Sequence, residues 1–83
     1  MATAESIERS IAAGIDCEHL EVRGDGQHWE ALIVSAAFEG LSKVRQHQLV
    51  YAALGDRMRE EIHALSMTTL TPAQWAKLQT GPG

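Results

Sequence analysis

The chain has 83 residues, 45% of them hydrophobic and 22% charged, so its composition favours one small globular domain over a disordered chain or two separate cores. Eleven Asp and Glu against seven Lys and Arg leave a net charge of -4, which argues against a protein whose main partner is a phosphate backbone or an anionic membrane. No apolar stretch approaches the roughly 18 residues that span a bilayer, the N-terminus lacks the basic and apolar regions of a secretory signal, and the single Cys17 cannot close an intramolecular disulfide. We therefore expect a soluble, cytoplasmic protein.

A helix is predicted at the start of the chain. Thr3 is a suitable N-cap for it. Ile7, Ile11 and Ile15 then recur at a spacing of four and form one apolar stripe. Gly14, near the end of this stripe, is a typical stop signal.

A β-hairpin is predicted next. Over residues 17–24 (CEHLEVRG), Leu20 and Val22 alternate with polar residues, as in a half-buried strand. The Gly-Asp-Gly run 24–26 supplies the turn, because Asp-Gly tolerates the positive φ that short hairpins demand. Residues 28–38 (HWEALIVSAAF) follow as a longer strand, whose apolar centre suggests burial on both faces.

Helical patterns dominate the segment after Gly40. The predicted cap is Ser42, and the predicted apolar face consists of Val50, Leu54 and Met58, with Val44 and Tyr51 close to it. A single helix from Ser42 to about Glu61 fits the pattern. A helix that ends near Leu54, with Asp56 capping a short second helix, fits it too, and we favour this second interpretation.

The last third of the chain predicts a strand and a helix. Residues 62–70 (IHALSMTTL) have strand chemistry, and residues 71–79 (TPAQWAKLQ) begin with Thr71 as cap and Pro72 at the first helical position. Residues 1–79 therefore form one predicted domain of order α-β-β-α-α-β-α, and residues 80–83 a frayed C-terminal tail.

His28 and His63 are predicted to meet at one edge of the sheet. About two dozen mostly helical residues join the second strand to the third, and such a connection usually links parallel strands by a right-handed crossover. Each histidine stands at the start of its strand, so neighbouring strands about 5 Å apart would place both imidazoles at the same edge. Two separate edge histidines are the alternative, because periodicity does not establish that the strands are neighbours.

As a metal site, this pair of histidines is incomplete. Neutral imidazole is a common ligand for transition metals, but a closed zinc site needs four ligands and a catalytic one usually three. Cys17 precedes the first strand and is not expected at this edge. We therefore expect a partner to supply the remaining ligands. His19 is expected on a solvated strand face and His47 at the edge of a helical apolar stripe, and neither is assigned as a ligand.

Enzyme chemistry has little support in the sequence. No nucleophile elbow, phosphate-binding loop, HExxH motif or paired-carboxylate signature occurs in it. We therefore expect a protein that is not an enzyme.

Two segments carry a family resemblance. FEGLSKVRQHQLVYAAL (residues 38–54), followed by IHALSMTTLTPAQW (residues 62–75), resembles the BolA family, whose signature runs Phe-x-Gly-x-Ser-x-Val-x-x-x-x-x-Val-Tyr, then Ile-His-Ala-x-Ser and Thr-Pro-x-x-Trp. The resemblance implies an α+β fold similar to a class II KH domain, with a three-stranded mixed sheet packed against helices, in agreement with the order predicted above. No GxxG occurs in this sequence, so the loop by which KH domains clamp nucleic acid is missing.

The resemblance also implies a function. BolA-like proteins pair with monothiol (CGFS-type) glutaredoxins and share a 2Fe-2S cluster with them, for iron-sulfur trafficking or for iron and redox signalling, and the glutaredoxin and its glutathione provide thiolates. The family's own ligands are the histidine of the Ile-His-Ala element, which is His63 here, and a Cys or His of the loop between the first two strands. In this chain the loop reads GDGQHW and the residue is His28, so the chain resembles the histidine subgroup in its short bacterial form. We expect the isolated protein to carry no cofactor and to be a monomer or a weak homodimer.

Two other functions stay open as alternatives. BolA proteins have also been regarded as transcriptional regulators with a helix-turn-helix-like middle segment, which would make Lys43, Arg45 and His47 nucleic-acid contacts. The sequence departs from the family here, because Gln46, His47 and Gln48 stand where many members have Arg-His-Arg. Two cations make a weak electrostatic footprint on DNA, so DNA binding is the second hypothesis. A structural adaptor without a metal is the third.

Overall fold

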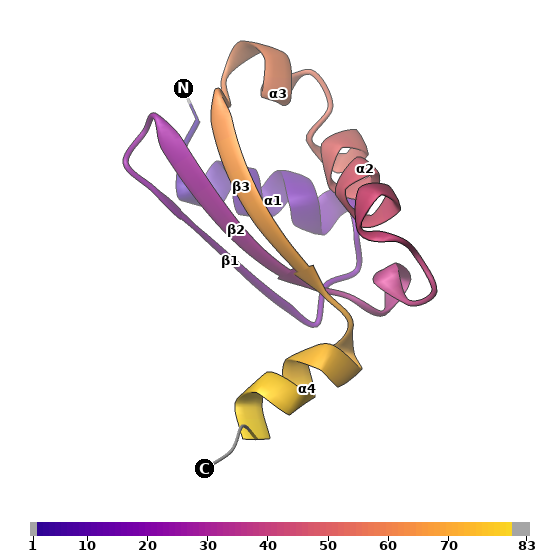
Figure 1. Ribbon diagram of the computed structural model, residues 1–83. Helices are drawn as coiled ribbons and strands as arrows, with labels where there is room; N and C mark the ends of the chain where they lie inside the picture. Colours follow the sequence, from indigo (N-terminus) through magenta and orange to yellow (C-terminus); the bar gives the residue numbers. More distant parts are fainter. Residues whose placement is uncertain (1, 81–83) are drawn as a thin grey trace.

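Figure 1 shows the computed structural model of the protein, which describes residues 2–80, the side chain of Thr80 excepted. Its elements are α1 (Ala4–Gly14), β1 (His19–Gly24), β2 (His28–Val34), the 3-10 helix η1 (Ala36–Phe38), α2 (Lys43–Leu54), α3 (Arg57–Glu60), β3 (Ala64–Leu70) and α4 (Pro72–Thr80). The order of α-helices and strands is the predicted one. Most of the predicted frayed tail, residues 81–83, lies outside the described residues. Within residues 2–80, no helix combines the length and the apolar character that a membrane span requires.

The three strands form one mixed sheet in the order β1-β2-β3. β1 and β2 pair antiparallel as a hairpin, with His19 opposite Val34 and Gly24 opposite Trp29. β2 and β3 pair in parallel, as the helical crossover between them predicts, with His28 opposite Ala64. The predicted α+β fold with a three-stranded mixed sheet is therefore confirmed.

The core lies between one face of the sheet and the helices α1 and α2, which Figure 1 shows behind and beside the sheet. The predicted stripe of α1 is confirmed, because its isoleucines are buried there. Strand alternation supplies the other wall, where the buried side chains are Val22, Trp29, Ala31 and Ile33. The opposite sheet face carries exposed polar side chains, and α4 extends past the end of β3 (Figure 1).

The predicted second strand is too long. β2 ends at Val34, because Ser35 is fully buried and turns the chain. The Ser35 hydroxyl accepts a hydrogen bond from the backbone N–H of Ala37 (3.1 Å) and donates one to the carbonyl of Asp16 (2.7 Å), so residues 36–38 form η1. Burial on both faces is confirmed only at the end of the apolar run, where the neighbours Ile33 and Val34 are both fully buried, whereas Leu32 on the open face is half-buried.

The favoured interpretation of two helices after Ser42 is confirmed, with two corrections. α2 ends at Leu54, where Gly55 adopts a positive φ of 59°. Asp56 precedes α3 as predicted, but it makes no side-chain cap hydrogen bond. Val44 and Tyr51, predicted close to the buried face, are 66% and 44% exposed. Each residue of an α-helix turns the side chain by about 100°, so Tyr51 points away from the core when its neighbour Val50 is buried.

Candidate metal-binding edge

The parallel pairing of β2 with β3 brings His28 and His63 to one edge of the sheet. His28 begins β2 and is paired with Ala64, the first residue of β3, so His63 immediately precedes its partner. The prediction that His63 begins the strand is wrong by one residue. Adjacent strands lie about 5 Å apart, so the two residues are close neighbours along this edge. Both side chains are exposed, that of His28 to 77%.

The hairpin turn next to His28 is held by one carboxylate. Asp25 Oδ1 accepts hydrogen bonds from the backbone N–H groups of His28 (2.8 Å) and Gln27 (2.9 Å), and the backbone N–H of Asp25 donates to the carbonyl of His28 (3.2 Å). These backbone hydrogen bonds, chiefly the one from His28, hold the pKa of Asp25 below its ordinary value. The turn therefore fixes the backbone of His28, while its ring extends into solvent.

Trp29 anchors the other side of His28. Its side chain is 4% exposed and lies over Gly24, where a Cβ atom would come within 2.4 Å of the ring and of the His28 carbonyl oxygen. The positive φ predicted for this turn occurs at Gly26 (98°). Trp29 Nε1 is buried without a hydrogen-bond partner, so the ring is placed by packing alone.

The backbone that leads to His63 is also fixed by a buried neighbour and a hydrogen bond. Ile62 is fully buried, and its backbone N–H donates to the carbonyl of Arg57 (2.8 Å) in α3. His63 is therefore the first exposed residue after a buried anchor. Asp25 and Arg57 are not among the predicted residues of this edge. The Asp-x-x-His spacing, which is typical of an Asx turn, is a local signal for Asp25. No local signal in the sequence marks Arg57.

The part of the chain that the structure describes gives no third ligand at this edge. Among residues 2–80, no group of three or more His, Cys, Asp or Glu side chains lies close enough to hold a metal ion. Cys17 is half-buried, and its thiol donates to the carbonyl of Ile15 (3.4 Å). Burial, reinforced by the charge of Asp16, raises the pKa of the Cys17 thiol, which disfavours the thiolate that a metal needs.

His19 is not the solvated side chain that the sequence predicts. Its ring stacks on Trp75 of α4, with ring centroids 4.7 Å apart and planes inclined by 18°, and its Nε2 lies 2.8 Å from Glu21 Oε2. The hydrogen bond with His19 is the main cause that lowers the pKa of Glu21. His19 therefore connects β1 to the last helix and does not belong to the edge that carries His28.

The three candidate nucleic-acid contacts lie on α2. Lys43 Nζ donates to the carbonyl of Thr69 in β3, so its ammonium group already has a partner in the protein. Arg45 is exposed and lines a hollow of about 340 Å³ together with Leu41, Gln48 and Leu49. His47 is half-buried, as the sequence predicts. Of these three residues, only Arg45 presents a cation to solvent without a hydrogen bond to the fold.

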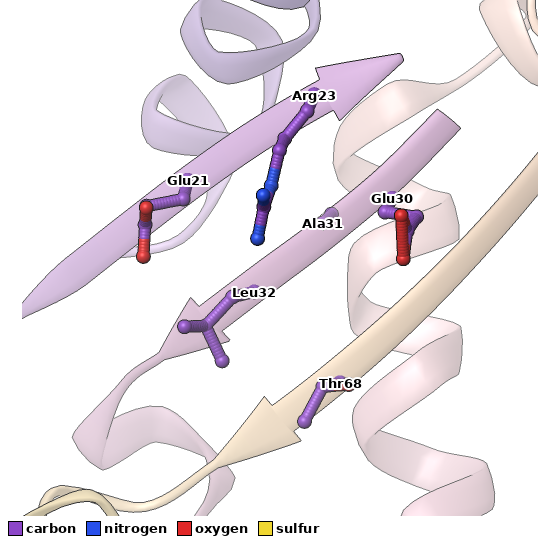
Figure 2. A pocket seen from close by; sticks show the side chains of 6 residues that line it. All are labelled: Glu21, Arg23, Glu30, Ala31, Leu32 and Thr68. Atoms are coloured by element: carbon purple, nitrogen blue, oxygen red, sulfur yellow. The ribbon is translucent and has the colours of Figure 1, made fainter. Parts of the chain in front are cut away.

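The open face of the sheet carries a shallow hollow of about 230 Å³ (Figure 2). Figure 2 shows Arg23 of β1 lying between Glu21 on the same strand and Glu30 on β2. Leu32 and Thr68 complete the rim. The face therefore carries one cation among two carboxylates and does not form the positive surface that a phosphate backbone requires.

Comparison with known proteins identifies the family. The family model described as "BolA-like protein" matches residues 8–74. The acid stress protein IbaG of Escherichia coli is 33% identical over 72 residues, which cover 86% of each chain. Human BolA-like protein 1 is 40% identical over 67 residues, 77% of this chain and 49% of that protein, so the present chain spans about half its length. The DNA-binding transcriptional regulator BolA of Haemophilus influenzae is 38% identical over 65 residues, 77% of this chain and 63% of that protein.

Solved structures agree with the sequence match. A bolA homologue from Coxiella burnetii superposes with a TM-score of 0.78 at 39% identity, over 92% of this chain and 99% of that one. A bol-like protein from Babesia bovis superposes with a TM-score of 0.85 at 29% identity, over 95% of each chain. None of these relatives bears the name of an enzyme. On the match over residues 8–74 and the shared fold, this chain belongs to the BolA family.

Proposed function

We propose that the protein is a non-enzymatic partner of a monothiol (CGFS-type) glutaredoxin and supplies His28 and His63 to a 2Fe-2S cluster that the two proteins share. The observation that carries the proposal is the parallel register of β2 and β3, which pairs His28 with the residue after His63. Both histidines are exposed, and the backbone beside each is held by hydrogen bonds, from the His28 N–H to the Asp25 carboxylate and from the Ile62 N–H to the Arg57 carbonyl. A rigid backbone with exposed rings suits ligands that a partner completes.

The donor set fits one side of such a cluster. Two imidazoles are too few to close a metal site, and Cys17 is turned into the fold with a raised pKa. The remaining ligands are thiolates, which the glutaredoxin and its glutathione provide in this proposal. When bound, a cluster with two imidazoles on one iron carries less negative charge than an all-thiolate one and has a higher reduction potential. The work of this chain is to hold two neutral rings at one edge and to exchange the cluster with its partner, in iron-sulfur trafficking or iron and redox signalling.

Anaerobic reconstitution with a CGFS-type glutaredoxin and glutathione tests this proposal. We expect the mixed complex to show absorption, circular dichroism and EPR spectra that differ from those of the glutaredoxin alone. His63→Ala and His28→Ala are each expected to change these spectra, because each variant removes an imidazole ligand. We also expect cluster retention to fall by at least about tenfold, as for lost metal-site groups in general.

His47→Ala is the matched control, because it removes one imidazole from α2, away from the edge. Its spectra should equal those of the unchanged protein. If His28→Ala and His63→Ala also leave the spectra of the mixed complex unchanged, the ligand assignment is wrong. If no mixed complex forms with the unchanged protein, the glutaredoxin partnership itself is wrong.

DNA binding is the second candidate function, because one relative is named a DNA-binding transcriptional regulator. The contacts in this proposal are Arg45, Lys43 and His47, of which Lys43 is engaged with Thr69. A salt titration of binding to duplex DNA measures the number of phosphate contacts through its slope. Loss of affinity in Arg45→Ala would support this function, and absence of binding even at low salt would remove it.

A further inference from the structure

Arg57 ties α3 to α1 with its whole guanidinium group. Its Nη1 donates to the Ser6 carbonyl (2.8 Å) and to Ser10 Oγ (2.6 Å), its Nη2 donates to Ser6 Oγ (2.7 Å), and its Nε donates to Glu61 Oε2 (3.2 Å). The side chain is only 23% exposed. A planar guanidinium with several short, partly buried hydrogen bonds fixes orientation in a way that a surface ion pair does not.

α3 has little else to hold it in place. It has four residues, Arg57 to Glu60, too few for a helix that is stable by itself. Asp56 gives it no side-chain cap, and none of its residues is fully buried. Met58 packs against the core as a half-buried side chain. The position of α3 therefore depends on Met58, on the buried Ile62 that follows the helix and on the hydrogen bonds of Arg57 to α1.

The main chain of Arg57 continues this connection towards His63. The Arg57 carbonyl accepts hydrogen bonds from the backbone N–H groups of Glu61 (2.9 Å) and Ile62 (2.8 Å). His63 is the next residue, and Ala64 after it enters the sheet beside His28. Arg57 thus forms hydrogen bonds to α1 through its side chain and to the segment before His63 through its carbonyl group.

We propose that Arg57 is the positioning residue of His63: by fixing α3 on α1 it holds the Glu61–Ile62 segment so that His63 stands next to Ala64, the residue paired with His28. This inference rests on the proposed function, because it gives Arg57 a purpose only if His63 is a ligand. Arg57 itself contacts no cluster in this proposal. It acts through the backbone at 61–62.

The free protein provides the first test. Hydrogen exchange of the Glu61 and Ile62 amides reports how often the end of α3 opens. Arg57→Ala should speed this exchange about tenfold or more relative to the unchanged protein, the size expected for lost hydrogen bonds of a charged group. Arg59→Ala is the matched control, because Arg59 lies exposed on the same helix and carries the same charge. Equal exchange rates in Arg57→Ala and Arg59→Ala would overturn the proposal.

A second variant covers the case in which Arg57→Ala does not fold. Ser10→Ala removes one acceptor of the guanidinium from α1 and leaves α3 unaltered. The loss of one hydrogen bond should speed exchange at Glu61 and Ile62 by about threefold. Unchanged exchange at both amides in Ser10→Ala would count against the connection to α1.

The mixed complex with a glutaredoxin provides a spectroscopic test. Arg57→Ala should shift the EPR and circular dichroism spectra towards those of His63→Ala and weaken cluster retention by about 10 to 100-fold, as for other groups that orient metal ligands. Arg59→Ala should leave both unchanged. Arg57→Lys keeps the charge but not the planar fork, so it should restore the spectra only in part.

A double-mutant cycle separates positioning from general stability. If Arg57 acts through His63, adding Arg57→Ala to the His63→Ala variant should not change the spectra further. Adding Arg57→Ala to the His28→Ala variant should change the spectra as much as it does in the unchanged protein. An equal effect in both backgrounds would overturn the proposal. A complex that never forms with the unchanged protein would refute the proposed function, while the exchange rates would still decide whether Arg57 fixes the segment before His63.

Discussion

At the scale of single residues, the close packing of Trp29 against Gly24 fixes the hairpin. The ring of Trp29 fills the space in which any other residue at position 24 would put its Cβ atom, 2.4 Å from ring carbon Cε3. We predict that Gly24→Ala lowers the free energy of unfolding by about 1 to 3 kcal/mol, because the added methyl group overpacks a buried contact. Chemical denaturation measures this change.

Glu30→Ala serves as the control for this prediction, since Glu30 is an exposed residue on the same hairpin. Such a surface change should stay within about 0.5 kcal/mol of the unchanged protein. The double variant Gly24→Ala, Trp29→Leu separates two causes, because a smaller side chain at position 29 relieves the contact with the ring but not the contact with the His28 carbonyl oxygen, which is also 2.4 Å from the added Cβ atom. Equal stability of Gly24→Ala and the unchanged protein would contradict the overpacking argument.

The same residues show what a local pattern can predict. The Gly-Asp-Gly run predicts a turn, and Gly26 has the positive φ that such a turn requires. The need for glycine at position 24 comes from the ring of Trp29 and from the His28 carbonyl oxygen, each 2.4 Å from an added Cβ atom, and the placement of the ring depends on packing against the core. Sequence spacing does not carry that information.

At the scale of elements, α4 is connected to the sheet through His19. The stacked rings of His19 and Trp75, 4.7 Å apart, join the start of β1 to the middle of the last helix, and Glu21 holds the other side of the imidazole. Both His19 and Glu21 are partly exposed. The contact therefore orients α4 more than it stabilises the fold.

We predict that His19→Ala raises the pKa of Glu21 towards its ordinary value, because the hydrogen bond with His19 is the main cause of the lowered value. Carboxyl NMR titration measures this change. A lowered pKa in the folded state means that the pair contributes to stability above the unfolded pKa and that this contribution is lost as pH falls through the folded pKa. Amides of α4 should also exchange faster in this variant. His47→Ala should change neither quantity, and an unaltered pKa of Glu21 in His19→Ala would refute the assignment.

The elements differ in how far their sequence predicts them. The stripe of α1 is local, so a spacing of four is enough to identify it. α2 is harder, because Val44 and Tyr51 have the side chains of core residues but stand on its exposed side, and Gln46 has a polar side chain but is buried. The partners across the fold decide which face of such a helix is buried, and periodicity within the helix does not contain them.

For the whole molecule, the crossover between β2 and β3 is the most informative part of the sequence. It predicts that the two strands run in parallel, and the neighbourhood of His28 and His63 follows from that pairing. The contacts that fix the edge are not predictable, because Arg57 and Ser6 are 51 residues apart in the chain. The contacts of Asp25 are easier to predict, since its side chain accepts hydrogen bonds from residues only two and three positions later. The role of the two histidines as ligands stays a prediction.

Gln46 joins η1, α2 and β3 across the molecule. Its side-chain Nε2 donates to the carbonyls of Phe38 (3.2 Å) and Leu41 (3.0 Å), and its Oε1 accepts from Thr69 Oγ1 (2.6 Å). Both Gln46 and Thr69 are buried. In the sequence, Gln46 stands where many family members have an arginine, which weakens the DNA-binding pattern. In the fold, the same residue forms hydrogen bonds with buried polar groups of two other segments.

Removing Gln46 should therefore destabilise the whole fold. We predict that Gln46→Ala lowers the free energy of unfolding by about 2 to 3 kcal/mol, because the Thr69 hydroxyl and the Leu41 carbonyl lose the partner that Gln46 provides, while the Phe38 carbonyl keeps its hydrogen bond from the Leu41 N–H. Gln48→Ala, an exposed change two residues away, should cost little. Gln46→Leu combined with Thr69→Val should be more stable than Gln46→Leu alone, because the second change removes the orphaned hydroxyl. Denaturant titrations of the four variants measure these free energies of unfolding. If Gln46→Ala and Gln48→Ala lower the free energy of unfolding equally, the buried hydrogen bonds of Gln46 do not stabilise the packing of η1, α2 and β3.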